Sequence, residues 1–565
     1  MGMKISRLLA VLYVLSTSME PFSLSPRDVG RESQWASFFH QASIGNYLNQ
    51  QLYGMMQKHQ NQHDKDSDSL LPKPLSTVTD TLNSLRLVPE SHENLEEFVA
   101  RFFQDLPCTP VICISLISEN QHVILLPVNS ILEGGLSDDD MNSSSRVSFK
   151  GKDFVKSWKC PWVTTVVDYI APKFRQLLEG NYYSSSGHFQ EDTKESRLLW
   201  WKKRNRLDKC LCKFIQDVED HWLGVWKYVL SGEWPNLEHL DSIEEGLCEE
   251  EKCVLRIISS KKCYLDVRSE ASSSKVSVDI DSLMQSVFEK IHATSDDVDK
   301  VECVKRSPII LVLDFEVQML PWENLPILRN KEVYRMPSVG SIVATLNRCC
   351  QDQAITFPLI DPVDLYYLLN PDGDLNHTQV EFEHWFQDQN FEGKSATVPP
   401  INELTVALKN HDLFVYMGHG SGMQYIPGSK IQELDSCAAT LLMGCSSGSL
   451  SLRGCYAPRG APISYLLAGS PVIVANLWEV TDKDIDRFGK AVLNAWLRER
   501  KEAPPDCAQC NVNVKKYKSI DRCTHRPRIG SFMGQARDAC TLPFLIGASP
   551  VCYGVPTCIM RKKNV

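Results

Sequence analysis

Asp412-Leu-Phe-Val-Tyr-Met-Gly-His419-Gly-Ser-Gly422 and, further along, Ala438-Ala-Thr-Leu-Leu-Met-Gly-Cys445-Ser-Ser-Gly448 are the stretches that decide the fold of this chain. Each begins with a run of five or six mostly apolar residues and then breaks at glycines. These runs lack the alternation of polar and apolar residues that a half-exposed strand shows, so they predict strands buried on both faces. Buried strands of this kind are typical of a parallel sheet covered by helices. The sequence therefore predicts an α/β fold.

A histidine follows the first predicted strand and a cysteine follows the second. Ligands of such sheets bind at the carboxyl ends of the strands, so we expect His419 and Cys445 to lie together at one rim. A free thiol has a pKa of about 8.5 and needs a base to become a nucleophile near neutral pH. His419 would take the thiol proton and return it to a leaving amine, while the N–H groups of Gly420 and Cys445 would face the oxyanion.

A structural alternative treats His419 as a turn residue and Cys445 as a buried thiol, because free cysteine is among the most buried residue types. For an arbitrary His and Cys this alternative is favoured. Two strand-end patterns in one predicted sheet argue against it here. The sequence thus indicates a cysteine-nucleophile site.

The stretches Tyr416 to Ile426 and Leu442 to Gly448 resemble the catalytic signature of separases, which are caspase-fold cysteine endopeptidases. The order, His before Cys, differs from that of papain-like enzymes. The resemblance covers roughly residues 95–565. It implies an N-terminal helical segment and linker over 1–95, an inactive caspase-like domain over 96–355 with a helical insert at about 154–235, and a caspase-like catalytic domain over 356–565.

The same resemblance implies a substrate and a partner. Separases cleave the kleisin subunit of cohesin after arginine, which releases sister chromatids at the metaphase–anaphase transition, and securin inhibits them. They carry a long N-terminal helical-repeat region that binds securin, and this chain has almost none of it. We therefore expect the securin docking surface to be largely missing, and a fragment, a short isoform and an incomplete gene model all stay open. The resemblance implies no cofactor.

An acidic segment follows a third predicted strand, Pro471 to Trp478. Asp482 can cap the next helix, and carboxylates in a first turn favour the helix dipole, so the acids have a purely structural explanation. The functional interpretation, supported by the resemblance, is a pocket for the arginine before the cleaved bond. Asp482 and Asp486 share a helix face while Asp484 points away. We predict Asp486 first and Asp482 second as the guanidinium partner.

Composition limits the other classes of function. The net charge of −10 over 565 residues argues against nucleic acid as the main partner. The 20 cysteines are scattered through the chain, which favours reduced thiols and a location in cytoplasm and nucleus. Residues 1–18 imitate a secretory signal, so secretion is the alternative. No apolar run has the length of about 18 residues that a membrane-spanning helix needs, so no membrane partner is expected.

Two rival functions remain open at this point. Gly444 to Gly448 also matches the G-x-S-x-G elbow of an α/β-hydrolase, with Ser446, Asp486 and His525 in the chain order of that triad. An elbow must run directly into a helix, however, and residues 454–462 are rich in glycine and proline. The other rival is a catalytically silent interaction protein.

A cysteine-rich stretch near the C-terminus suggests a weak metal site. Its candidate zinc ligands are Cys507, Cys510, Cys523 and His525. The first pair has the spacing of zinc ligands, whereas the closing Cys-Thr-His is tighter than usual. A polar loop without metal is the favoured interpretation.

Overall fold

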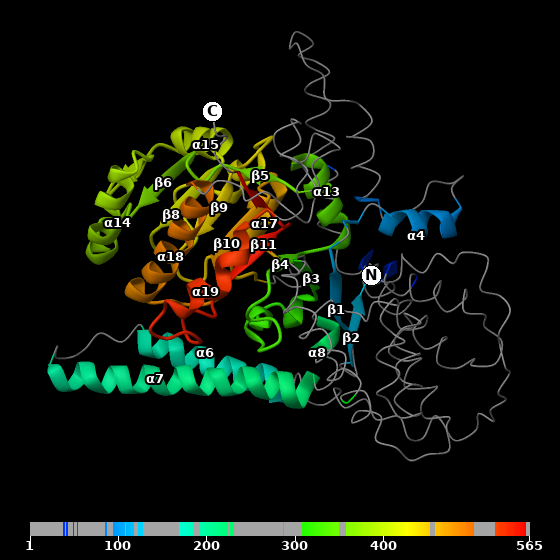
Figure 1. Cartoon of the computed structure of the whole chain (residues 1–565), viewed down its shortest axis with the longest axis horizontal. Coiled ribbons are helices and arrows are strands. Elements are labelled where there is room, and N and C mark those ends of the chain that lie inside the picture. The colour runs from blue at the N-terminus through cyan, green and yellow to red at the C-terminus, as the bar shows by residue number, and fades with distance from the viewer. Residues whose placement is uncertain are drawn as a thin grey trace, which may run out of the picture. The chain divides into compact units, whose positions relative to one another are not determined.

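The computed structural model in Figure 1 divides into two compact units that interleave along the chain. The smaller unit contains residues 1–46, 88–172 and 217–317, and the larger contains 47–87, 173–216 and 318–565. The structure describes residues 94–104, 109–117, 122–127, 169–185, 193–223, 227–230, 308–349, 357–451, 458–501 and 526–560, with isolated positions elsewhere. The predicted domain boundaries at 95 and 355 stay a prediction.

The larger unit is built on a mostly parallel sheet. Its strands lie in the order β4-β11-β10-β9-β8-β6-β7. Their bounds are β4 Val333–Met336, β6 Leu365–Leu369, β7 Glu392–Ser395, β8 Leu413–Met417, β9 Ala439–Leu442, β10 Val472–Asn476 and β11 Pro550–Gly554. Neighbouring strands are parallel except β10 and β11, which are antiparallel. A short parallel pair, β5 (Leu359–Ile360) and β12 (Cys558–Ile559), lies apart from this sheet.

The central strands β8, β9 and β10 are buried along their whole lengths. Their unbroken apolar sequences suit this position, because side chains on both faces of the sheet meet covering helices. In the register of β8 and β9, Leu413 pairs with Ala439 and Tyr416 with Leu442. The residues that follow the two strands are therefore side by side. The predicted α/β fold class and the predicted buried strands are confirmed.

Helices cover both faces of the sheet. They are α13 Val339–Cys349, α14 Asn376–Asp388, α15 Ile401–Asn410, α16 Gly428–Gln432, α17 Ala461–Leu467, α18 Asp482–Lys501 and α19 Met533–Asp538. Helix α18 packs against both α14 and α19, whereas α16 packs against α17. Crossovers between parallel strands are right-handed. The chain crosses the sheet in one direction from β6 to β7 and in the opposite direction from β8 through β9 to β10. The helices of these two sets of connections therefore lie on opposite faces of the sheet.

The larger unit also contains a long helical hairpin, α6 (Ala171–Ser185) and α7 (Lys194–Asp217), whose helices run side by side in Figure 1. The rings of Phe174 and Phe214 stack with centroids 5.4 Å apart and hold the two helices together. This hairpin falls within the helical insert predicted for about 154–235. Its helix α6 donates a hydrogen bond to the backbone of residue 479, which follows β10.

The smaller unit contains strands β1 (Val111–Ile117), β2 (His122–Pro127) and β3 (Ile309–Leu313), with helices α4 (Leu95–Gln104) and α8 (Lys227–Leu230). β1 pairs with β2 antiparallel and with β3 parallel. Trp222, expected to be a core anchor, is 4% exposed, and it lies in the π-helical turn Val218–Leu223. Its expected partner Trp226 lies outside the described residues.

Two sequence predictions fall outside the residues that the structure describes. They are the secretory-like stretch 1–18 and the weak zinc candidates Cys507, Cys510, Cys523 and His525. Within the described part of the chain, no helix is long and apolar enough to span a membrane. No group of His, Cys, Asp and Glu in that same part could hold a metal ion.

Candidate active site

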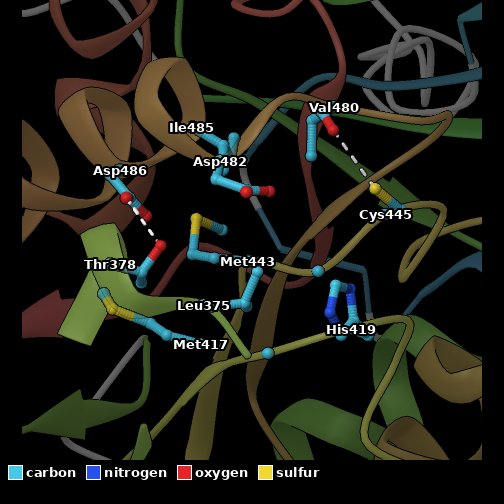
Figure 2. Close-up of a pocket in the computed structure, with 12 residues that line it drawn as sticks. Leu375, Thr378, Met417, His419, Met443, Cys445, Val480, Asp482, Ile485 and Asp486 are labelled. Carbon is cyan, nitrogen blue, oxygen red and sulfur yellow. Dashed lines mark hydrogen bonds between the residues drawn. The ribbon is translucent and has the colours of Figure 1, made fainter. Parts of the chain in front are cut away.

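A pocket lies at the carboxyl ends of β8, β9 and β10. Its lining is Leu375, Thr378, Met417, Gly418, His419, Met443, Gly444, Cys445, Val480, Asp482, Ile485 and Asp486. Figure 2 shows Cys445 and His419 on one side of this pocket and Asp486 with Thr378 on the other, with Met443 and Leu375 between them. The structure thus brings together four predicted site residues that are dispersed over 68 positions of sequence, from 419 to 486.

The loops that carry His419 and Cys445 are pressed against each other at a glycine. A Cβ atom at Gly444 would collide with the carbonyl oxygens of Gly418 and Gly420. Gly420 itself has a φ of +62°, a conformation that favours glycine. These glycines allow two strand-end loops to approach closely enough for an imidazole and a thiol to share one pocket.

The thiol of Cys445 is held by the segment that follows β10. Its Sγ donates a hydrogen bond to the carbonyl oxygen of Val480 over 3.2 Å. Burial raises the pKa of this thiol, and the carboxylates of Asp482 and Glu479 act in the same direction. The arrangement favours a protonated thiol at rest, because apolar surroundings and nearby negative charge both disfavour the thiolate.

His419 is half exposed, and a carboxylate orients its ring. Its Nε2 lies 3.1 Å from Oδ2 of Asp374, and the side-chain exposures of the two residues are 51% and 60%. The hydroxyl of Tyr416 and the amide of Gln424 both donate to the carbonyl oxygen of His419 and fix the loop. If Nε2–H donates to Asp374, the lone pair of Nδ1 is the one available to take the thiol proton.

Asp374 is not among the site residues predicted from the sequence. It stands in the loop after β6, and β6 lies beside β8 in the parallel sheet. A base that is oriented by a third group is the usual arrangement around an activated nucleophile. The run of apolar residues before Asn370-Pro-Asp-Gly-Asp374 is the pattern that could have identified it, since all such strands end at the same rim.

The other side of the pocket is formed by the beginnings of two helices. Asp486, on α18, is 4% exposed and accepts a 2.8 Å hydrogen bond at Oδ2 from the hydroxyl of Thr378 on α14. Burial raises the pKa of Asp486 to about 7, and the carboxylates of Asp482 and Glu381 add to this effect. The imidazole of His377 lies 3.8 Å from the same oxygen of Asp486, at an exposed position. A guanidinium inside the pocket would stabilise the ionised carboxylate further.

The three aspartates of α18 divide as the helix period predicts. Asp482 and Asp486 line the pocket, and Asp482 is exposed. Asp484 instead accepts hydrogen bonds from the backbone N–H groups of Thr541 and Leu542, at 2.7 and 2.9 Å. Asp484 is therefore structural, whereas the specificity roles of Asp486 and Asp482 stay predictions.

The hydrolase alternative does not fit the local backbone. Ser446 has a φ of +51°, as an elbow serine would, but residues 445–448 form turns and the next helix among the described residues, α17, begins at residue 461. Its hydroxyl donates to Oε1 of Glu479 over 3.1 Å, and Asp486 binds Thr378 instead. His525 lies outside the described residues.

The oxyanion role of the Gly420 and Cys445 amides stays a prediction.

Comparison with known proteins gives one consistent family. Residues 264–485 match the family model described as Separin, protease domain. Separin of Schizosaccharomyces pombe is 30% identical over 428 residues, which are 68% of this chain and 22% of that protein. Separin of Mus musculus is 30% identical over 385 residues, which are 65% of this chain and 17% of that protein. The chain spans about a fifth of the length of the curated relatives it matches.

Solved structures show the same fold. The Saccharomyces cerevisiae separase–securin complex matches with a TM-score of 0.59 and 19% sequence identity. The match covers 99% of this chain and 38% of that chain. The structural match thus covers more of the chain than the family model does, and at 19% identity it shows the fold alone.

Proposed function

The protease domain of this chain belongs to the separase family, and from that premise we propose that it is a cysteine endopeptidase cutting proteins after arginine. The observation that carries the proposal is the shared pocket of His419, Cys445 and Asp486. A thiol with a neighbouring imidazole supports nucleophilic attack on a peptide bond. A buried carboxyl group in the same pocket supports binding of a cationic side chain next to that bond.

In the proposed reaction, His419 takes the proton of Cys445 and the thiolate attacks the peptide carbonyl carbon. The C–N bond breaks, a thioester forms, and His419 gives the proton to the leaving amine. Water then hydrolyses the thioester with His419 again as base. The thiol must first leave the carbonyl of Val480, to which it donates in the resting structure. Arrival of substrate would replace this contact.

The substrate and partner follow from the family. We propose the kleisin subunit of cohesin as substrate, with release of sister chromatids at the metaphase–anaphase transition as the outcome. The match to the Saccharomyces cerevisiae separase–securin complex supports securin as a partner, and its action as inhibitor is part of the proposal. Action in cytoplasm and nucleus is part of the proposal, and the unbridged thiols of Cys437, Cys445, Cys540 and Cys552 support a reducing compartment.

Cleavage of short peptides tests both the proposed activity and the proposed arginine pocket. Purified protein is incubated with matched fluorogenic peptides that carry arginine, lysine or glutamine before the reporter bond. The arginine peptide should be cleaved fastest and lysine more slowly, because a planar guanidinium can bind a carboxylate at two points. No cleavage of the arginine peptide by a folded protein would contradict the proposed activity. Equal cleavage of all three would contradict only the arginine pocket.

A further inference from the structure

The inserted hairpin α6–α7 touches the segment that holds the catalytic thiol. The side-chain amide of Asn181, on α6, donates a hydrogen bond over 2.8 Å to the carbonyl oxygen of Glu479, 298 residues away in sequence. One residue earlier in that segment, the ring of Trp478 meets Phe174 of α6 edge to face, with centroids 5.8 Å apart. Two successive residues after β10 are therefore fixed by one inserted helix.

The same segment binds the nucleophile loop on its other side. The carbonyl oxygen of Trp478 accepts the N–H of Ser446 over 3.2 Å, and the carboxylate of Glu479 accepts the Ser446 hydroxyl. The carbonyl oxygen of Val480 accepts the thiol of Cys445. Residues 478–480, the bridging segment, thus lie between the hairpin and the nucleophile and bind both.

Asn181 is itself rigidly held. It is fully buried, and its Oδ1 accepts a 3.1 Å hydrogen bond from the equally buried Arg204 of α7. Arg204 also donates to the hydroxyl of Ser184 and lies over the ring of Trp200. Since the guanidinium can only donate, it fixes Asn181 with the amide nitrogen toward Glu479. A buried polar cluster of this kind specifies one geometry rather than adding much stability.

We propose that Asn181 is a positioning residue for the nucleophile, which acts through the bridging segment to set the orientation of the Cys445 thiol. The inserted hairpin would then be part of the catalytic apparatus and not a peripheral decoration. In this arrangement a change at the hairpin, more than 220 residues before the nucleophile in sequence, alters how readily the thiol leaves Val480. Asn181 touches neither substrate nor thiol.

The test uses Asn181→Asp in the full chain. This variant keeps the shape and the acceptor for Arg204, but it loses the donor to Glu479 and leaves that carbonyl unpaired. The first readout is the rate of Cys445 alkylation by iodoacetamide between about pH 6 and 9.5, followed by mass spectrometry of the peptide that contains Cys445. We expect the midpoint to shift by about half a pH unit from that of the parent, because the thiol no longer donates to a carbonyl held in a fixed position.

The second readout is cleavage of the arginine peptide, which rests on the proposed function. We expect kcat to fall about tenfold with KM within about twofold, since the change affects the reacting thiol and not the binding pocket. If the parent shows no cleavage, the proposed function fails, while the alkylation profile still decides the role of Asn181. Asn181→Ala serves in place of Asn181→Asp should the latter not fold.

Two matched variants separate positioning from general stability. Ser184→Ala removes a buried hydroxyl from the same cluster that does not touch the bridging segment. Asn205→Ala removes an exposed amide that bonds only within α7, to the carbonyl of Trp201. Both should keep the parent alkylation midpoint. An unchanged midpoint and kcat in Asn181→Asp, or an equal shift in Ser184→Ala, would overturn the proposal.

Discussion

The two sides of the pocket are built by different kinds of structure. Cys445 and His419 stand on loops that follow neighbouring parallel strands, whereas Asp486 and Thr378 stand near the beginnings of two packed helices. The base side is open, with the His419 side chain 51% exposed, and the acid side is closed, with Asp486 4% exposed. The proposed nucleophile and base thus lie where water and substrate can enter, and the proposed specificity residue lies where a charge is desolvated.

This difference has an energetic consequence. An exposed pair such as His419 and Asp374 contributes little, on the order of 0–1 kcal/mol, because solvent screens it. A buried carboxyl group is costly to ionise and gains much from one well-placed cation. Substitutions on the two sides should therefore differ in the size of their effect on cleavage and in whether that effect depends on the substrate.

The largest effect is expected at the nucleophile. Cys445→Ser and His419→Ala should each reduce cleavage of the arginine peptide by roughly three orders of magnitude or more, because thiolate and base act as one unit. Steady-state kinetics on folded protein, checked by thermal melting, measures this. Ser446→Ala is the matched control and should lose only a few-fold. If Ser446→Ala were inactive and Cys445→Ala active, the hydrolase alternative would be restored.

The second effect belongs to the acid side. Asp486→Asn should lower kcat/KM for arginine peptides by about two orders of magnitude or more, at roughly 1.4 kcal/mol for each factor of ten. Alkylation of Cys445 by a small reagent should hardly change, because the reagent need not enter the acid side. Asp482→Asn, at an exposed position, should cost less. Normal cleavage by both variants would leave these acids as helix-start residues only.

The positions of His419 and Cys445 could be predicted from the sequence, because the topology of the sheet brings the ends of their strands together. An apolar run followed by glycine marks the carboxyl end of a buried strand, and adjacent parallel strands bring such ends together. The choice of Asp486 over Asp484 needed only the helix period. The contact of Asp486 with Thr378 and that of Asn181 with Glu479 join residues 108 and 298 positions apart, and no local pattern predicts such packing.

The thiol itself shows where sequence reasoning stops. A strand-end cysteine beside a histidine predicts an activated thiolate, yet burial and the nearby carboxylates of Asp482 and Glu479 favour the thiol in the resting structure, where it donates to the Val480 carbonyl. Activation therefore depends on a change at the bridging segment or on substrate binding. The residue types determine the chemistry, whereas the backbone around them determines its resting state.

A third, smaller effect is one of stability. The pKa of Asp486 is raised to about 7 from 3.8, so between these values the folded chain keeps a proton that the unfolded chain has released. This contribution to stability is lost as the pH rises through that window. Asp486→Asn has no titrating group at this position. When the pH is raised from 5 to 8, the melting midpoint of the parent should therefore fall by several degrees relative to that of the variant. Parallel melting curves at both pH values would contradict the buried, protonated carboxyl group.

The smallest effect is expected at Asp374, the carboxylate beside the imidazole of His419. Asp374→Asn keeps the size of the side chain and leaves an oxygen that can still accept from Nε2–H of His419, so it removes mainly the charge. Because the pair is exposed, we expect kcat to fall by no more than about tenfold, with KM unchanged. Asp372→Asn, an exposed acid in the same loop, is the matched control and should behave like the parent. A loss of a thousandfold in Asp374→Asn would mean that substrate closes over the pair and removes it from water. The base side would then be as desolvated in the working enzyme as the acid side already is at rest, and the contrast between the two would hold only for the free protein.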